Sequence, residues 1–106
     1  MVTLLRWPEA TDGFKAGEYG CIEEAINAGL LIIDDVGAEH DPSRNGTDKL
    51  CQVLSRREKR FTLLTTNIKP EAWAERFDVR IADRLLRNSV VLNLACESYA
   101  LREEAA

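Results

Sequence analysis

An apolar run that ends in two acidic residues constrains this chain more than any other feature. Residues 30–33 read LLII, and Asp34 and Asp35 follow without a spacer. A continuous apolar run of this kind is typical of a strand covered on both faces of a parallel sheet. Two adjacent carboxylates repel each other and are not easily buried without partners. Because ligands bind beyond the carboxyl ends of strands in open parallel sheets, the acids mark a candidate site.

The rest of the chain alternates between strand and helix patterns. We expect strands at 2–6, 30–34, 61–67 and 89–94. Apolar residues at helical spacing predict helices within 18–29, 47–60, 70–77 and 79–87, whereas turn-forming residues predict a loop at 7–20 and a turn at 41–46. This alternation predicts an α/β fold, a parallel sheet with flanking helices, in which 1–106 form one domain or part of one.

Helix ends are marked by short polar side chains. Ser43 or Asn45 is expected to cap the helix after the turn, and Asp78 is expected to cap the last helix, which Asn88 would end. Beyond the last strand, 95–106 read as a polar tail.

Size, charge and cysteine content exclude several classes of protein. A chain of 106 residues with a net charge of −4 is one small domain without an overall basic character. No apolar stretch approaches the roughly 18 residues of a membrane span, and the N-terminus lacks a signal-peptide pattern. We therefore expect a cytoplasmic protein without a membrane partner. Cys21, Cys51 and Cys96 form no C-x-x-C pair, so neither a zinc site nor a disulfide framework is predicted.

A second strand end supplies polar groups that could join the two acids. Thr65, Thr66 and Asn67 close the strand at 61–67, where they could reach a phosphate beside the acids. Asp34 could hold a hydrated magnesium ion through its waters, and Asp35 could orient an attacking water. The plainer interpretation is that the acids only end a strand and cap the next turn.

Arginines form two groups in the second half of the chain. Arg76, Arg80, Arg84 and Arg87 are spaced four, four and three apart, which predicts one helical stripe. A solvated charged face is the alternative interpretation. A basic cluster at 56–60 ends the helix before the second strand, where the helix dipole favours cations. Binding of single-stranded DNA is possible for both groups, although few aromatic residues lie among them to stack on bases.

At this point the sequence resembles a known family. The segments LLIIDDVGAE, TLLTTN, RIADRLL and NSVVLNLACESYALRE occur in this order over about 18–103. Their order and spacing are similar to those of the DnaC/IstB-like branch of the AAA+ ATPases, which are helicase loaders and helper ATPases of transposition. The resemblance implies a partial AAA+ P-loop NTPase fold, ATP and Mg²⁺ as cofactors, a replicative helicase or transposase as partner, and a homo-oligomer when complete.

The resemblance also implies roles for individual residues. Asp34 matches the magnesium position of the Walker B strand, and Asp35 matches the catalytic acid, with a shorter side chain than the frequent glutamate. Asn67 matches sensor 1, which helps to place the attacking water. Arg84 matches the arginine finger that acts on ATP held by a neighbouring subunit, with Arg80 as the fallback.

Thr66, beside Asn67, is assigned to the binding of the nucleotide together with Asp34 and Arg80.

Two features depart from the family pattern. Ala100 stands where the family ending has the sensor 2 arginine, and Arg102 lies two residues further on. No G-x-x-x-x-G-K-[ST] phosphate loop occurs in the sequence. In the family that loop lies upstream of Walker B, on a segment that would precede Met1. The resemblance therefore implies the later part of an AAA+ domain, which alone should bind ATP weakly and show no turnover.

Two rival interpretations belong to other classes. A phospho-receiver domain also has an acidic pair after an apolar strand, but it needs a later Thr or Ser and a Lys, and no Lys follows Lys69. A non-enzymatic interaction module descended from the ATPase would keep the sheet and the arginines and hydrolyse nothing. The AAA+ interpretation predicts 62–66 beside 30–34, with 2–6 on the far side. It places 89–94 a strand's width from 62–66, or paired with 62–66 after collapse, or paired with another chain.

Overall fold

The computed structural model describes residues 2–57, 59–87 and 90–91. In chain order its elements are β1 (Val2–Arg6), α1 (Trp7–Lys15), α2 (Gly20–Asn27), β2 (Leu30–Val36), α3 (Asn45–Arg56), β3 (Phe61–Thr66), the 3-10 helix η1 (Pro70–Ala72), α4 (Trp73–Arg76) and α5 (Val79–Arg87). The helices expected within 18–29, 70–77 and 79–87 are confirmed as α2, η1 with α4, and α5. The helix expected within 47–60 is confirmed as α3, which begins two residues earlier, inside the expected turn.

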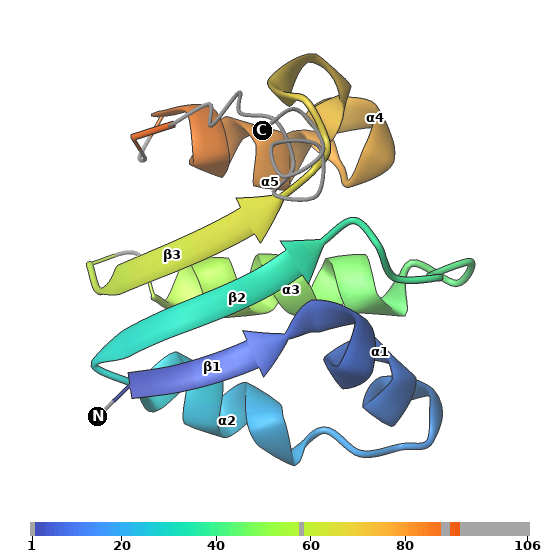
Figure 1. Ribbon diagram of the computed structural model, residues 1–106, viewed down its shortest axis with the longest axis vertical. Helices are drawn as coiled ribbons and strands as arrows, with labels where there is room; N and C mark the ends of the chain where they lie inside the picture. Colours follow the sequence, from blue (N-terminus) through green and yellow to red (C-terminus); the bar gives the residue numbers. More distant parts are fainter. Residues whose placement is uncertain (1, 58, 88–89, 92–106) are drawn as a thin grey trace, which may run out of the picture.

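Three parallel strands form the sheet in the order β1-β2-β3 (Figure 1). This order confirms that 62–66 lies beside 30–34 and that 2–6 lies on the far side. The α/β class with a parallel sheet and flanking helices is confirmed as well. Because the strands are parallel, their carboxyl ends meet at one edge of the sheet, and this edge carries the candidate site.

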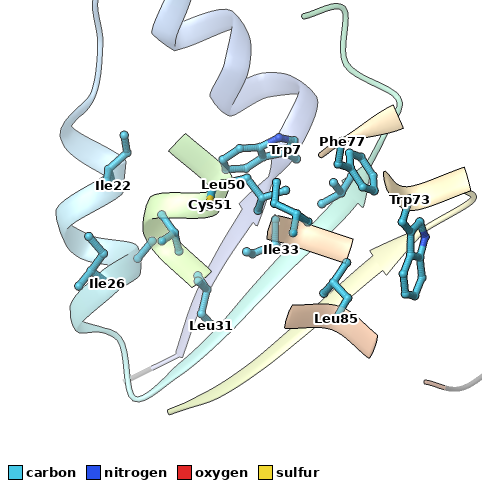
Figure 2. Packing of buried hydrophobic residues seen from close by; sticks show 14 of the residues in the cluster. Trp7, Ile22, Ile26, Leu31, Ile33, Leu50, Cys51, Trp73, Phe77 and Leu85 are labelled. Carbon is cyan, nitrogen blue, oxygen red and sulfur yellow. The ribbon is translucent and has the colours of Figure 1, made fainter. Parts of the chain in front are cut away.

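One face of the sheet forms the core with the helices. Leu31 and Ile33 of β2 are fully buried. Figure 2 shows them together with Leu50 of α3 and Leu85 of α5, which belong to the same buried cluster. Burial of these side chains is the main force that holds the helices to the sheet.

The opposite face of the sheet is apolar and open to solvent. Its side chains form two rows across the three strands, set by the pairing register: Val2, Leu30 and Phe61, then Leu4, Ile32 and Leu63. Phe61 is 83 % exposed and Leu63 is 53 % exposed. The sequence predicted a central strand covered on both faces. This prediction is wrong for the described part of the chain, in which only one face of β2 is covered. A parallel sheet with an open apolar face is unusual, and a surface of this kind favours contact with other apolar groups.

We expect this open face to bind a hydrophobic dye such as ANS. The double change Phe61→Lys and Leu63→Lys should lower the dye fluorescence of the isolated chain by about half, because it places two charges in the exposed apolar rows. Val79→Lys is the matched control, since Val79 is 72 % exposed but lies on α5. Equal losses in both variants would show that the sheet face is not the dye site.

The segment after β1 is a helix and not the loop that the sequence predicted. α1 buries Trp7, Thr11 and Phe14, which are spaced four and three apart along one helical face. Pro8 lies in the first turn of the helix, where its missing N–H costs nothing. The segment 7–20 thus contains a short amphipathic helix, which its turn-forming residues did not predict.

Asp41 caps α3, although Ser43 and Asn45 were the expected caps. Its carboxylate accepts hydrogen bonds from the amides of Gly46 (3.0 Å) and Thr47 (2.9 Å) and from the Thr47 hydroxyl (3.0 Å). Ser43 accepts only a longer bond of 3.4 Å from the amide of Asn45. Burial alone would raise the pKa of Asp41, but these bonds and the charge of Arg44 lower it below its ordinary value. The expected cap of α5 is confirmed, because Asp78 accepts a 2.9 Å bond from the amide of Ile81.

We expect Asp41→Asn to lower the free energy of unfolding by about 1 kcal/mol at neutral pH. A carboxyl whose pKa is lower in the folded state stabilises the fold above its unfolded pKa of about 3.9 and loses this effect as the pH falls through the folded value. The difference between parent and variant should therefore shrink in urea titrations below about pH 4. Ser43→Ala is the comparison, and an equal or larger loss there would favour the cap expected from the sequence.

Several expectations lie outside the described residues. These are Asn88 as a helix end, the tail at 95–106, Cys96, Ala100 and Arg102. Of the strand expected at 89–94, only 90–91 are described, and these two residues are exposed and belong to no strand. Its distance from β3 stays a prediction. In the described part of the chain, no helix has the length and apolar character that crossing a membrane requires.

Candidate functional site

The two acids lie in an irregularity at the carboxyl end of β2. Ile33 pairs with Leu64 and Val36 pairs with Thr66, so two residues of β2, Asp34 and Asp35, face one residue of β3. This is a bulge with one extra residue on β2, and we call it the acid bulge. Asp35 has a φ of 62°, in the left-handed region that non-glycine residues rarely adopt. A bulge redirects side chains, and this one leaves Asp35 exposed and Asp34 half-buried at the sheet edge.

Thr65 ties the two acids to the neighbouring strand. Its hydroxyl donates a 2.6 Å hydrogen bond to Oδ1 of Asp34 and accepts a 2.8 Å bond from the backbone amide of Asp35. This hydroxyl therefore fixes one carboxylate and the backbone that carries the next. The sequence placed Thr65 near the acids as a possible phosphate contact but did not predict that it bonds to them, since hydrogen-bond partners about thirty residues apart leave no local signal.

The two polar residues after Thr65 have different surroundings. The Thr66 hydroxyl donates a 2.5 Å bond to the Val36 carbonyl and accepts a 3.1 Å bond from the amide of Ile68. Its side chain thus joins two loops, and contact with a nucleotide stays a prediction. Asn67 is exposed at the carboxyl end of β3, on the same sheet edge as the acids. Its position is compatible with the predicted role in placing a water.

The expected stripe of four arginines is wrong, because Arg76 belongs to α4 and only three arginines lie on α5. Arg80 forms a 2.8 Å ion pair with Asp78 and a 3.4 Å pair with Asp48. Arg87 pairs with Asp83 one turn before it, at 2.6 Å.

Arg84 is half-buried, less exposed than its neighbour Arg87. Among the residues that the structure describes, no carboxylate forms an ion pair with it. Of the two arginines proposed as a finger, Arg84 is thus the one without a fixed acidic partner in this part of the chain, and Arg80 is engaged.

The basic cluster at 56–60 is largely a structural feature. Arg57 is 2 % exposed, and its guanidinium donates to the carbonyls of Ala25, Ile26, Ala28 and Phe61 and to the hydroxyl of Thr62. Arg60 also donates to the Ile26 carbonyl, at 2.7 Å. The sequence treated both as surface cations. Because Arg57 is buried by these hydrogen bonds, its side chain is not part of a surface that could bind single-stranded DNA.

The donor groups at the acid bulge suit magnesium better than a softer metal. The carboxylates of Asp34 and Asp35 are hard oxygen ligands, and Mg²⁺ prefers one or two such carboxylates together with waters and substrate phosphates. In the described ranges, no three acidic, histidine or cysteine side chains gather into a complete metal site. The residues therefore fit a magnesium ion that a bound nucleotide would share, and not an ion held by protein alone.

A parallel sheet with an acid pair at the end of its central strand and an exposed polar residue after the next strand defines the class. The fold is that of a partial P-loop NTPase domain. The chain belongs to the family of IstB-like ATP binding proteins, whose pattern matches residues 9–106. This confirms the family resemblance found in the sequence.

Curated relatives are proteins of bacterial insertion sequences whose names describe them as ATP-binding. The chain is 39 % identical over 101 residues to that of IS5376 from Geobacillus stearothermophilus, a match that covers 85 % of this chain and 39 % of the relative. It is 37 % identical over 81 residues to that of IS232 from Bacillus thuringiensis, with 70 % and 32 % covered. It is 34 % identical over 90 residues to that of IS21 from Pseudomonas aeruginosa, with 78 % and 33 % covered. The chain thus spans roughly a third of the length of these relatives.

Proposed function

We propose that this chain carries the acid-bearing part of a magnesium-dependent ATPase that assists transposition. The acid bulge is the observation that carries the proposal, because Thr65 holds Asp34 and the backbone of Asp35 together at the carboxyl edge of the sheet. Family membership and the insertion-sequence names of the relatives support ATP as the ligand and transposition as the setting.

The two acids divide the chemistry between them. Asp34, with one oxygen bonded to Thr65, keeps its second oxygen for the water shell of a magnesium ion. When bound, magnesium neutralises charge on the phosphates. Asp35 is exposed and directed by its left-handed backbone, so its carboxylate can accept a hydrogen bond from the water that attacks the terminal phosphate.

Asn67 and Arg84 complete the proposed site. Asn67 orients the same water from the end of β3. Arg84 acts on nucleotide held by a second copy of the protein, which makes the active form a homo-oligomer. Arg80 and Thr66 contribute, together with Asp34, to nucleotide binding. For the protein partner we favour a transposase, because the relatives are named for insertion sequences, over the replicative helicase that the wider family implies.

A hybrid protein tests the proposal. In this hybrid the chain replaces the matching 39 % of the Geobacillus relative. We expect the hybrid to bind and hydrolyse ATP with magnesium, and Asp35→Asn to lower the hydrolysis rate by about 10² or more while ATP still binds, because an amide is a far weaker base. Asp12→Asn on α1 is the matched control, since Asp12 is exposed and distant in the chain from the acid bulge.

The same experiment separates the rival function. A hybrid that binds ATP without hydrolysis, and whose Asp35→Asn variant behaves identically, would identify a non-enzymatic interaction module. Hydrolysis at an unchanged rate in Asp35→Asn would remove Asp35 from the reaction.

A further inference from the structure

The loop that follows the acid bulge is held from two sides. On one side the Thr66 hydroxyl donates to the carbonyl of Val36, the first residue after the bulge. On the other side a terminal nitrogen of Arg76 donates to the carbonyls of Gly37 (3.0 Å) and Glu39 (3.1 Å). Arg76 ends α4, so one helix that lies well beyond β3 in the chain binds directly to the loop at 36–39.

Glu39 completes this arrangement from inside the loop. Its side chain is only 2 % exposed, and Oε2 accepts a 2.6 Å hydrogen bond from the amide of Gly37. Its other carboxylate oxygen lies 3.9 Å from the terminal nitrogen of Arg76. A buried carboxylate needs such partners, and it has both an amide and a cation. We call Glu39 and Arg76 the loop clamp.

The clamp holds a segment whose backbone adopts left-handed conformations in a crowded place. Gly37 has a φ of 107°, and a Cβ at this position would lie 2.6 Å from Cγ1 of Ile68. Two residues earlier, Asp35 is also left-handed, at 62°. Unfavourable backbone conformations persist only where the surrounding structure determines them strongly. Thr65 holds the amide of Asp35 itself, and the clamp holds the loop that leaves it.

We infer that Glu39 and Arg76 are positioning residues that keep the acid bulge in shape and so set the direction of Asp35. The inference rests on the proposed function only for the chemical role of Asp35. Neither clamp residue needs to touch the nucleotide. The guanidinium binds two carbonyls and faces one carboxylate, so the clamp also joins α4, and through it α5 with Arg84, to the loop after the acids.

Nuclear magnetic resonance on the 106-residue chain tests this inference. In Arg76→Met, which keeps the aliphatic stem, we expect the amide of Gly37 to exchange about tenfold faster, because its acceptor loses the cation that faces it. The Cα and Cβ chemical shifts of Asp35 should move away from left-handed values. Signals of Leu31 and Ile33 in the core should stay in place. Arg76→Lys, which can still donate to one carbonyl, should recover part of the change.

Two further variants make the outcome decisive. Glu39→Gln removes the charge but keeps an acceptor for Gly37, so it should shift Asp35 in the same direction by a smaller amount, even where Arg76→Met is too unstable to study. Arg87→Met is the control, since Arg87 pairs with Asp83 on the surface of α5.

Unchanged Asp35 shifts in folded Glu39→Gln and Arg76→Lys proteins would overturn the inference. So would faster exchange spread evenly over the whole chain, which indicates a general loss of stability. No nucleotide enters this experiment, so its result is independent of the hydrolysis test.

Discussion

Arg57→Met is expected to lower the free energy of unfolding by about 3 kcal/mol or more, because it leaves several buried carbonyl groups without a donor. Arg57 is 2 % exposed and donates to three carbonyls at the end of α2, those of Ala25, Ile26 and Ala28. The last carbonyls of a helix have no partner within it and carry partial negative charge. The guanidinium therefore serves as both cap and counter-ion for α2.

The same guanidinium also fixes the start of β3. It donates to the Phe61 carbonyl (2.8 Å) and to the Thr62 hydroxyl (2.9 Å), so it joins α2 to the strand that leads to Thr65. Burial lowers the pKa of Arg57, and the nearby charge of Arg60 lowers it further. A domain of this size is stable by only about 5–15 kcal/mol, so the expected loss is a large share of the total.

Urea unfolding of Arg57→Met and Arg57→Lys provides the measurement. Lysine keeps the charge, but its single ammonium group cannot donate to all the carbonyls that the planar guanidinium of arginine reaches. It should therefore recover only a small part of the lost free energy of unfolding. Arg56→Met is the matched control, since Arg56 is the exposed residue next in the chain. A loss in Arg57→Met no larger than in Arg56→Met would show that the buried network contributes little.

Arg84→Ala is expected to lower ATP hydrolysis in the hybrid protein by about 10³ or more, because arginine fingers contribute this much in related phosphoryl-transfer systems. ATP binding should stay nearly intact, since the finger acts on charge that develops in the transition state. Arg84 is the arginine of α5 that forms no ion pair with a carboxylate in the described residues, whereas Arg80 and Arg87 are paired. Steady-state rates and a separate binding titration are the measurements.

Mixed assemblies test whether Arg84 acts between subunits. Equal amounts of Arg84→Ala and Asp35→Asn hybrids should recover part of the activity, because some interfaces then join an intact finger to an intact acid. Arg87→Ala is the control for loss of surface charge on the same helix. If Arg84→Ala assembles and hydrolyses ATP at the parent rate, Arg84 is only part of a charged face.

The sequence by itself determined the sheet and the location of the site. The apolar runs at 2–6, 30–34 and 61–67 and the helical spacing between them were sufficient to predict strands in a parallel sheet, and the family resemblance supplied their order, which is the one observed. These signals are local, because the period of apolar residues reports which faces of an element can be buried. The position of the two acids followed from this prediction, since polar residues after a buried strand must lie at the edge of the sheet.

Only the tertiary structure decided how the site is shaped. The bulge that turns Asp35, the choice of Thr65 as the bridging hydroxyl and the burial of Arg57 all depend on partners about thirty residues away in the chain. The same holds for Arg76, which the sequence placed on a surface stripe and the structure places on the loop at 36–39. A hydrogen bond to a backbone carbonyl leaves no trace in residue type, because every residue has that carbonyl. Which arginine is buried is therefore decided by the packing of whole elements and not by its neighbours in the sequence.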